Sequence, residues 1–292
     1  MSYPEDLREQ VDNYLSTVQF GLETAPDGAD TTGLDEAMRY SLLAGGKRIR
    51  PVLCLATARA IGHPTKDFLA AAAALEMIHT YSLIHDDLPA MDDDDLRRGK
   101  PTSHVKFGEA VAILAGDGLF AEAIGVLASV DAPPERVVEA VSLLSSATGV
   151  EGMVGGQYVD VTADSLDADG LRYLHSLKTG RLIRASIEVA LALGGLDESA
   201  RAPYHRFATL IGLLFQIVDD ILDVTGSDEE LGKPQGSDVR HGKVTYVSLY
   251  GLPHARSLAS ETHEQALDAL AGAGGETEDL KRVADYIYSR EQ

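Results

Sequence analysis

Two clusters of aspartates stand beside apolar runs, where their carboxylates could share a divalent cation. The second cluster is Asp219-Asp220-Ile-Leu-Asp223. At about 3.6 residues per helical turn, Asp219 and Asp223 lie on one face, and Gln216 joins them from the preceding turn. Carboxylates this close repel one another, so the group destabilises the fold unless a positive charge binds. A solvated acidic helix end is the alternative, and it fits poorly with the apolar run 211–218 that leads into the cluster.

The first cluster is Asp86-Asp87-Leu-Pro-Ala-Met-Asp92, and it continues through residues 93–95. Pro89 is expected to end or kink a helix just after the first pair, because proline lacks a backbone N–H and restricts the residue before it. The loop that follows would then bring Asp92 back toward Asp86. Taken alone, this cluster could equally be a charged loop in an acidic protein.

Both clusters offer hard oxygen ligands without a neighbouring cysteine, which suits Mg²⁺, Mn²⁺ or Ca²⁺ rather than zinc. The loop pattern of calcium-binding helical pairs, with its glycine at the sixth position and glutamate at the twelfth, is absent. Mg²⁺ usually keeps several waters and is held by a couple of carboxylates together with substrate phosphates. The sequence therefore predicts Mg²⁺, with Mn²⁺ as a possible substitute, bridging the protein to a diphosphate.

Cations that could bind such an anion are concentrated in a few short stretches of a chain whose net charge is −21. These are Gly45-Gly-Lys-Arg-Ile-Arg-Pro51, Arg97-Arg-Gly-Lys-Pro-Thr102, Lys178-Thr-Gly180 and Lys233. Arginine offers a planar fork of donors to phosphate oxygens, and lysine offers a point charge. A surface patch is the alternative for the first stretch. Taken singly, Lys178-Thr-Gly180 is weak, and a simple helix kink is the favoured interpretation of it. His79, seven residues before Asp86 on the same helical face, is predicted to contact phosphate rather than to be a satisfied core histidine.

The elements that must position these residues are predicted to be helices. Leu34, Met38 and Leu42 recur at helical spacing, residues 70–74 are all alanine, and residues 210–222 are almost wholly apolar. Alternating strand patterns are nearly absent, and 244–249 is the one short candidate. We expect an all-α protein of roughly ten or more helices, folded as a single domain over residues 1–292, with loops at Ala25–Gly33 and Ala271–Glu278.

The composition of the chain limits the classes of molecule that it could bind and the compartment in which it is expected. The negative charge argues against nucleic acid or anionic lipid as the principal partner, and a salt-adapted source is one hypothesis for it. The sequence contains no run of about 18 apolar residues, so it predicts no membrane span. Its N-terminus is acidic, so it predicts no signal peptide either. The single cysteine, Cys54, lies among apolar residues and is expected to be a buried thiol. These features predict a cytoplasmic protein.

Together the motifs resemble the trans-isoprenyl diphosphate synthases. To the stretches above the resemblance adds Gly152-Met-Val-Gly-Gly-Gln157 and Gly242-Lys-Val-Thr-Tyr246, and it runs in the family's order from about Leu34 to Tyr286. It implies an all-α fold around a deep central cavity, a homodimer, and the Mg²⁺-dependent condensation of isopentenyl diphosphate with an allylic diphosphate. In that reaction the leaving diphosphate is stabilised by Mg²⁺ and cations, and no nucleophilic side chain is needed.

By matching position, the resemblance also implies roles for individual residues. The metal ligands would be Asp86, Asp87, Asp92, Asp219, Asp220 and Asp223. The allylic diphosphate would contact Arg97, Lys178, Thr179, Gln216 and Lys233, and isopentenyl diphosphate would contact Lys47, Arg50, His79 and Arg98. The residues expected to carry catalysis are Asp86, Asp87, Asp92, Arg97, Lys178 and Asp219.

Product length depends on Tyr81, which precedes Asp86 by five residues and so lies about 7.5 Å deeper along the helix. A large ring there could form the floor of the cavity. An aromatic residue at this position, with the insertion Pro89-Ala90, is similar to bacterial-type farnesyl diphosphate synthases, which favours a C15 product over the C20 product of geranylgeranyl diphosphate synthases. A class I terpene cyclase and a non-catalytic partner subunit are further alternatives. The cations Lys47, Arg50 and Arg98 count against the first, and the two complete aspartate clusters against the second.

Overall fold

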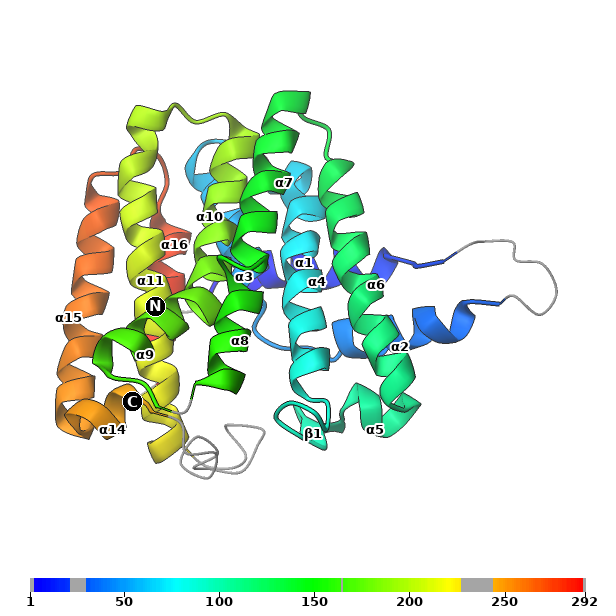
Figure 1. The fold of residues 1–292 in the computed structure, drawn as a ribbon. Helices are drawn as coiled ribbons and strands as arrows, with labels where there is room; N and C mark the ends of the chain where they lie inside the picture. The colour runs from blue at the N-terminus through cyan, green and yellow to red at the C-terminus, as the bar shows by residue number, and fades with distance from the viewer. Residues whose placement is uncertain (1–2, 22–29, 164, 227–243, 291–292) are drawn as a thin grey trace.

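The protein is an assembly of α-helices (Figure 1). The computed structural model describes residues 3–21, 30–163, 165–226 and 244–290. Within these residues the only strands are β1 (Leu96–Arg97) and β2 (Lys100–Pro101), which form a small antiparallel hairpin. The prediction of an all-α fold is confirmed.

Most of the helices run side by side in the bundle that Figure 1 shows. In chain order they are α1 (Glu5–Thr17), α2 (Thr32–Leu42), α3 (Ile49–Ala60), η1 (Thr65–Phe68), α4 (Leu69–Asp86), α5 (Ser103–Phe107), α6 (Glu109–Ala128), α7 (Pro134–Thr148), α8 (Met153–Thr162), α9 (Ala168–His175), η2 (Ser176–Gly180), α10 (Arg181–Gly194), α11 (Glu198–Thr225), α14 (Tyr246–Tyr250), α15 (Leu252–Ala271) and α16 (Glu278–Ser289).

Helix α4 lies in the core and carries the first aspartate cluster at its end. The alanines of its first turns are buried and small, so α3, α6 and α10 can all pack against it. Its burial persists to Ile84, two residues before the polar end at Asp86. A helix that is apolar all round is stable only when it is covered on all sides, which fixes the place of its charged end.

Helix α11 also lies in the core and carries the second aspartate cluster near its end. It packs against α10 and α15, and Ile211, Leu214, Ile217 and Val218 on its inner side are fully buried. The predicted apolar run therefore becomes a core helix, and Asp219 follows directly where that run ends.

Two short segments test the loop and strand predictions. Residues 244–249, the strand candidate, instead contain helix α14, because Thr245 accepts a hydrogen bond from the backbone N–H of Ser248 and forms a capping box that starts a helix. The predicted loop Ala271–Glu278 is confirmed, since α15 ends at Ala271 and α16 begins at Glu278. Most of the loop predicted at Ala25–Gly33 lies outside the described residues.

Two stretches among the described residues are long and apolar enough, by length and composition alone, to cross a membrane. They are Glu109–Ala128 and Pro134–Thr162, and about a third (33%) of the most apolar window of each is buried. The second stretch is interrupted between α7 and α8. The first carries Asp117 and Glu122 in its middle, and charges at the centre of a bilayer are costly. Both stretches are therefore weak candidates for a span.

Candidate active site

One large cavity of about 840 Å³ receives residues from both aspartate clusters. Asp86 at the end of α4 and Asp219 on α11 both line it, although more than a hundred residues separate them in the chain. Seven more of the predicted site residues line the same cavity: Arg50, His79, Tyr81, Arg97, Arg98, Lys178 and Thr179. The fold thus brings the predicted carboxylates and cations to one place.

The first cluster folds back on itself as its proline suggested. After α4 ends at Asp86, the backbone N–H of Asp92 donates to the backbone oxygen of Asp86 at 2.9 Å. Burial raises the pKa of Asp86 to about 6, Lys178 acts in the opposite direction, and Asp92 adds to the rise. The ionised form of Asp86 is therefore short of counter-charge in this arrangement.

Asp87 does not line the cavity and is held by an arginine. It is buried, and its Oδ1 accepts from Nε of Arg97 at 2.7 Å. Burial raises the pKa of Asp87, while the hydrogen bond from Arg97 opposes the rise. Arg97 comes from β1 and also approaches Asp94 at 3.5 Å. Asp87 therefore fixes the position of Arg97 beside the cavity.

The second cluster also contains one aspartate that lines the cavity and others that are buried. Asp219 keeps 52% of its side chain exposed, and the guanidinium of Arg290 lies 3.8 Å from its Oδ1. Asp220 is buried, and its two oxygens accept from Nε2 of Gln216 at 2.8 Å and from the backbone N–H of Tyr246 at 2.7 Å. Asp223 is also buried. Asp220 thus ties α11 to the start of α14, and Gln216 lines a smaller neighbouring pocket instead of the large cavity.

Lys178 and Thr179 reach the cavity from a single π-helical turn, η2, between α9 and α10. The predicted kink and the predicted site are therefore the same feature, and such turns are frequent at functional sites. Nζ of Lys178 donates to Asp160 at 2.7 Å. Gly156 of α8 packs directly against this turn, and a Cβ there would lie 2.4 Å from the backbone nitrogen of Lys178. Only glycine permits that approach.

The glycine-rich basic loop before α3 stacks against Arg98. Gly46 has φ 122°, and a Cβ on it would lie 2.8 Å from the guanidinium carbon of Arg98, which also donates to the backbone oxygen of Gly45. Arg50 lines the cavity with only 9% of its surface exposed, and burial lowers its pKa to about 10. Lys47 does not line the cavity, and its ammonium lies 5.2 Å above the ring of Tyr286.

His79 lines the cavity among these cations. Burial lowers its pKa well below the usual range, and the charges of Arg50 and Arg98 lower it further. The imidazole is therefore neutral near pH 7, so it can contact a phosphate as a hydrogen-bond donor but adds no charge.

Tyr81 and His85 line the cavity and form an aromatic cluster with Phe120, which is not part of the lining and is 39% exposed. Tyr81 lines the cavity and is 8% exposed, and its ring meets Phe120 and His85 edge-on at centroid distances of 5.3 and 5.7 Å. Edge-to-face packing of this kind is favourable. Phe120 comes from α6 and supports the ring of Tyr81.

Sequence reasoning missed several lining residues. Helix α8 supplies much of the wall through Met153, Val154, Gln157, Tyr158 and Val161. The motif ending at Gln157 was a visible signal, although no role had been attached to it. Arg290, which also lines the cavity, directly follows α16 and had no such signal. Lys233 and residues 242–243 lie outside the described residues.

Among the described residues no three histidine, cysteine, aspartate or glutamate side chains converge closely enough to hold a metal ion by themselves. A closed site, such as those of structural zinc, is therefore not formed by this part of the chain. Asp86 and Asp219 instead face an open cavity, the arrangement that a Mg²⁺ ion held jointly by protein and phosphate requires.

The helical bundle and its carboxylate-lined cavity define the isoprenoid synthase fold. The sequence model of the polyprenyl synthetase family matches residues 31–287. A heterodimeric geranylgeranyl pyrophosphate synthase large subunit of Arabidopsis thaliana is 46% identical over 94% of this chain and 76% of its own length. A geranylgeranyl pyrophosphate synthase of Capsicum annuum is 48% identical over 88% of this chain and 72% of its own. The chain therefore belongs to the polyprenyl synthetase family of prenyltransferases.

Solved structures agree with this assignment. An FPP/GFPP synthase of Zymomonas mobilis superposes with a TM-score of 0.83 at 37% identity, covering 97% of this chain and 96% of the other. A geranyltransferase of Helicobacter pylori, complexed with magnesium and isoprenyl diphosphate, superposes with a TM-score of 0.84 at 32% identity, covering 99% and 98%.

Proposed function

We propose that residues 1–292 form one catalytic domain of a Mg²⁺-dependent short-chain prenyl diphosphate synthase, which condenses isopentenyl diphosphate with allylic diphosphates and releases diphosphate. One observation carries the proposal: Asp86 and Asp219 line the same cavity. Arg50, Arg97 and Lys178 line it with them. Carboxylates and arginines together suit a metal-bound diphosphate, because each sign of charge then has its partner.

The donor set fits Mg²⁺. Asp86, Asp92 and Asp219 would hold the ions: Asp86 and Asp219 line the cavity, and Asp92 is folded back onto Asp86. The raised pKa of Asp86 supports this role, since a divalent cation supplies the missing counter-charge. Asp87, Asp220 and Asp223, predicted as ligands, would instead position the site. The first two are already bonded to Arg97 and to Gln216 and Tyr246, and Asp223 is buried.

The chain's own residues would drive the reaction by electrostatics. Mg²⁺, when bound, neutralises charge that grows on the leaving diphosphate. Arg97, Lys178 and Thr179 would hold that diphosphate, and Arg50, His79, Arg98 and Lys47 would hold the diphosphate of isopentenyl diphosphate. The apolar wall from α8 would exclude water from the allylic cation. Gln216 would contribute if substrate draws it toward the cavity. Lys233, predicted to contact the same diphosphate, lies outside the described residues.

For the product we propose C15, farnesyl diphosphate. Tyr81 lines the cavity five residues before Asp86 on α4, and the ring of Phe120 packs edge-on against it, so this pair of rings would limit the length of the growing chain. The volume of about 840 Å³ does not by itself separate C15 from C20, because it lies within the ordinary range of ligand pockets. The argument for C15 rests on the position of the rings.

A C20 product is the second candidate. It is favoured by the curated relatives, which are named geranylgeranyl pyrophosphate synthases at 42–48% identity. Those names concern the relatives. The solved structure from Zymomonas mobilis is named for FPP and GFPP, one product shorter and one longer than C20.

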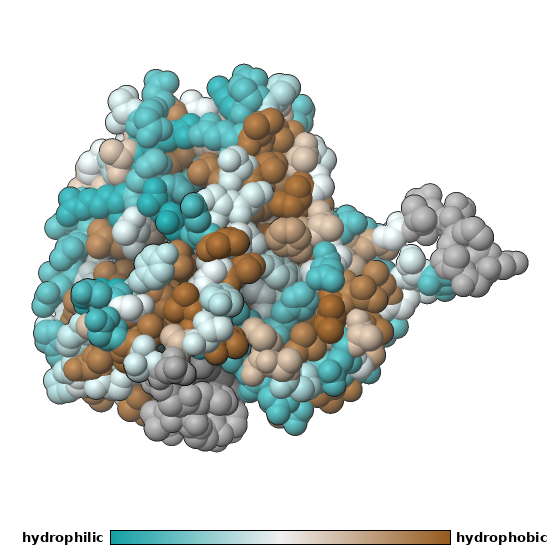
Figure 2. Space-filling view, viewed as in Figure 1, coloured by the Kyte–Doolittle hydropathy of each residue, from teal (hydrophilic) through white to brown (hydrophobic). Residues whose placement is uncertain are grey.

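A homodimer is part of the proposal. Apolar side chains gather over α6, α7 and α8 (Figure 2), and Ile113, Leu114 and Val138 are 43, 56 and 68% exposed. The outer face of α6 also carries Ala121 and Gly125, whose small size lets another helix approach closely. A second copy would offer the same face in return, as two-fold dimers require. The plant relatives are named chloroplastic, and a cytoplasmic location for this chain stays a prediction.

The test is incubation of the purified protein with Mg²⁺, isopentenyl diphosphate and dimethylallyl diphosphate, followed by chromatography of the dephosphorylated products. Farnesol is expected, geranylgeraniol would select the second candidate, and a cyclic hydrocarbon or no turnover would refute the function. Asp86→Asn and Asp219→Asn should each abolish turnover.

A further inference from the structure

Arg48 directly precedes α3, next to Lys47, and it does not line the cavity. Its φ of 53° is left-handed, a conformation that non-glycine residues adopt only where the surroundings hold them. Its side chain is only 1% exposed. A buried guanidinium is costly unless all of its charge is compensated, so its partners are decisive.

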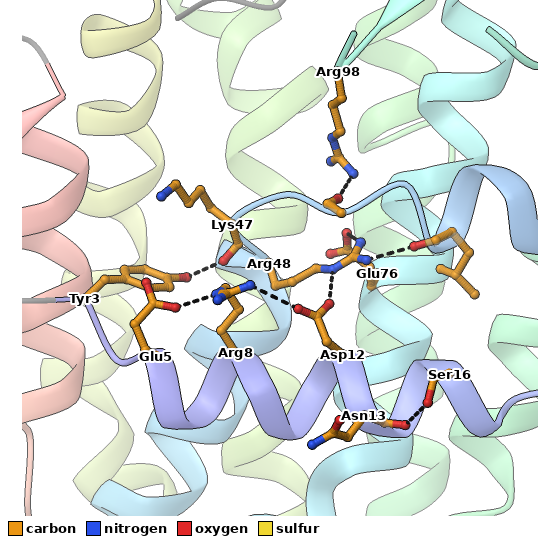
Figure 3. Close-up of polar contacts among 12 residues, drawn as sticks. Tyr3, Glu5, Arg8, Asp12, Asn13, Ser16, Lys47, Arg48, Glu76 and Arg98 are labelled. Carbon is orange, nitrogen blue, oxygen red and sulfur yellow. Dashed lines mark hydrogen bonds and ion pairs between the residues drawn. The ribbon is translucent and has the colours of Figure 1, made fainter. Parts of the chain in front are cut away.

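Those partners come from three separate elements (Figure 3). Nε donates to Asp12 of α1 at 2.9 Å, Nη1 donates to Glu76 of α4 at 2.6 Å, and Nη2 donates to the backbone oxygen of Leu42 at the end of α2 at 2.9 Å. Each guanidinium nitrogen therefore has its own acceptor. A planar fork with three fixed partners sets the orientation of the residue that carries it.

The backbone around Arg48 is held on both sides. The hydroxyl of Tyr3 donates to the backbone oxygen of Lys47 at 2.7 Å, and the ring of Tyr3 packs on Tyr286, which lies under the ammonium of Lys47. On the other side, Arg98 donates to the backbone oxygen of Gly45. The loop that presents the cations is thus fixed by Tyr3 on one side and by Arg98 on the other.

Glu76 also balances charge. It is 1% exposed, and its charge raises the pKa of Arg50 and of Arg98, opposing the burial that lowers both. One buried carboxylate therefore serves as counter-charge for Arg48 directly and for two cavity arginines at longer range.

We propose that Arg48, Asp12 and Glu76, here named the arginine brace, are positioning residues for the second diphosphate site. The brace sets the backbone from which Lys47 and Arg50 reach isopentenyl diphosphate, and none of its members touches substrate. This inference rests on the proposed function, and it makes helix α1 a functional part of that substrate site.

Helix α1 contains a matched control. Asp12 pairs with Arg48 at the start of α3, and Asp6 pairs with Arg59 in its last turn at 2.8 Å. Asp12→Asn and Asp6→Asn each remove one ion pair between the same two helices, and Asp12→Asn also removes the pair with Arg8 inside α1. Only Asp12 belongs to the brace. Steady-state kinetics with each substrate varied in turn then separate a local effect from a general loosening of α1.

Asp12→Asn is expected to raise the KM for isopentenyl diphosphate about tenfold, the effect of losing one charge-assisted hydrogen bond, with the KM for the allylic substrate and kcat within about twofold of wild type. Asp6→Asn should change none of these. Tyr3→Phe, which removes only the bond to Lys47, should raise the same KM by a smaller factor, and circular dichroism checks that each variant is folded.

An unchanged KM for isopentenyl diphosphate in Asp12→Asn, or an equal rise of both KM values, would overturn the inference. An equal effect of Asp6→Asn would do so too. The proposed function is tested by a different result: it is refuted if the wild-type protein makes no prenyl diphosphate.

Discussion

Replacing Asp86 by asparagine should stabilise the metal-free protein while it abolishes catalysis. Burial raises the pKa of Asp86 from 3.8 to about 6, so ionising this carboxyl is less favourable in the folded chain than in the unfolded one. Two pKa units correspond to about 3 kcal/mol. Because Asp86 is only partly buried and solvent screens part of that energy, we expect Asp86→Asn to raise the free energy of unfolding by about 1–2 kcal/mol at pH 8.

The free energy of unfolding that Asp86→Asn gains should increase with pH. The folded-state pKa lies above the unfolded one, so the folded state binds the proton more tightly and stability falls as pH rises between the two values. The penalty is fully present above about pH 6, close to half at about pH 5, and small near about pH 4. The advantage of asparagine should follow the same course.

The assay is urea denaturation in EDTA at pH 8 and pH 5, at fixed salt and protein concentration. Asp95→Asn is the control, because Asp95 belongs to the same cluster but has a side chain that is 84% exposed, and its change should stay within about 0.5 kcal/mol. Mg²⁺ with diphosphate should stabilise wild type and the control but not Asp86→Asn. A destabilised Asp86→Asn, or a gain equal at both pH values, would refute the reasoning.

Other predictions follow from single contacts. Tyr81→Ala should lengthen the product beyond C15 while Tyr81→Phe preserves it, and chromatography showing the same product from both would remove Tyr81 as the floor. Leu114→Glu should halve the mass measured by light scattering, and an unchanged mass would place the dimer contact elsewhere. Gly46→Ala should weaken isopentenyl diphosphate binding about tenfold or more, because its φ of 122° and its contact with Arg98 exclude a side chain, and a normal KM would contradict this. Cys54, whose pKa burial raises to about 12, should react with a thiol reagent at pH 8 only after unfolding, and rapid reaction of folded protein would contradict its burial.

The helices could be predicted from sequence because their signals are local. The alanine run of α4 and the apolar run of α11 each specify a core helix, and each places a carboxylate cluster at its end. Pro89 likewise marks the turn that returns Asp92 to Asp86. The strand candidate 244–249 was wrong because the capping contact of Thr245 with Ser248 starts a helix there.

The division of labour among the aspartates could not be predicted, because it depends on contacts distant in sequence. Nothing near Asp220 in the chain indicates that the backbone of Tyr246 caps it, and the pairing of Asp87 with Arg97 depends on a hairpin of two residues per strand. Phe120 was missed for the same reason, since only the packing of α6 on α4 brings its ring to Tyr81. Arg48 stood among the predicted cations, and only its contacts with Asp12, Glu76 and the backbone of Leu42 separate it from them.

The central claim is that Asp86 and Asp219 hold one metal-bound diphosphate between them. A crystal structure of the protein with Mn²⁺ and an unreactive thio-analogue of the allylic diphosphate tests it most directly, because anomalous scattering locates the ions. The account predicts ions bound to Asp86 and Asp92 on one side and to Asp219 on the other, all sharing the same diphosphate. Ions found on one cluster alone, or a diphosphate bound without either, would contradict it.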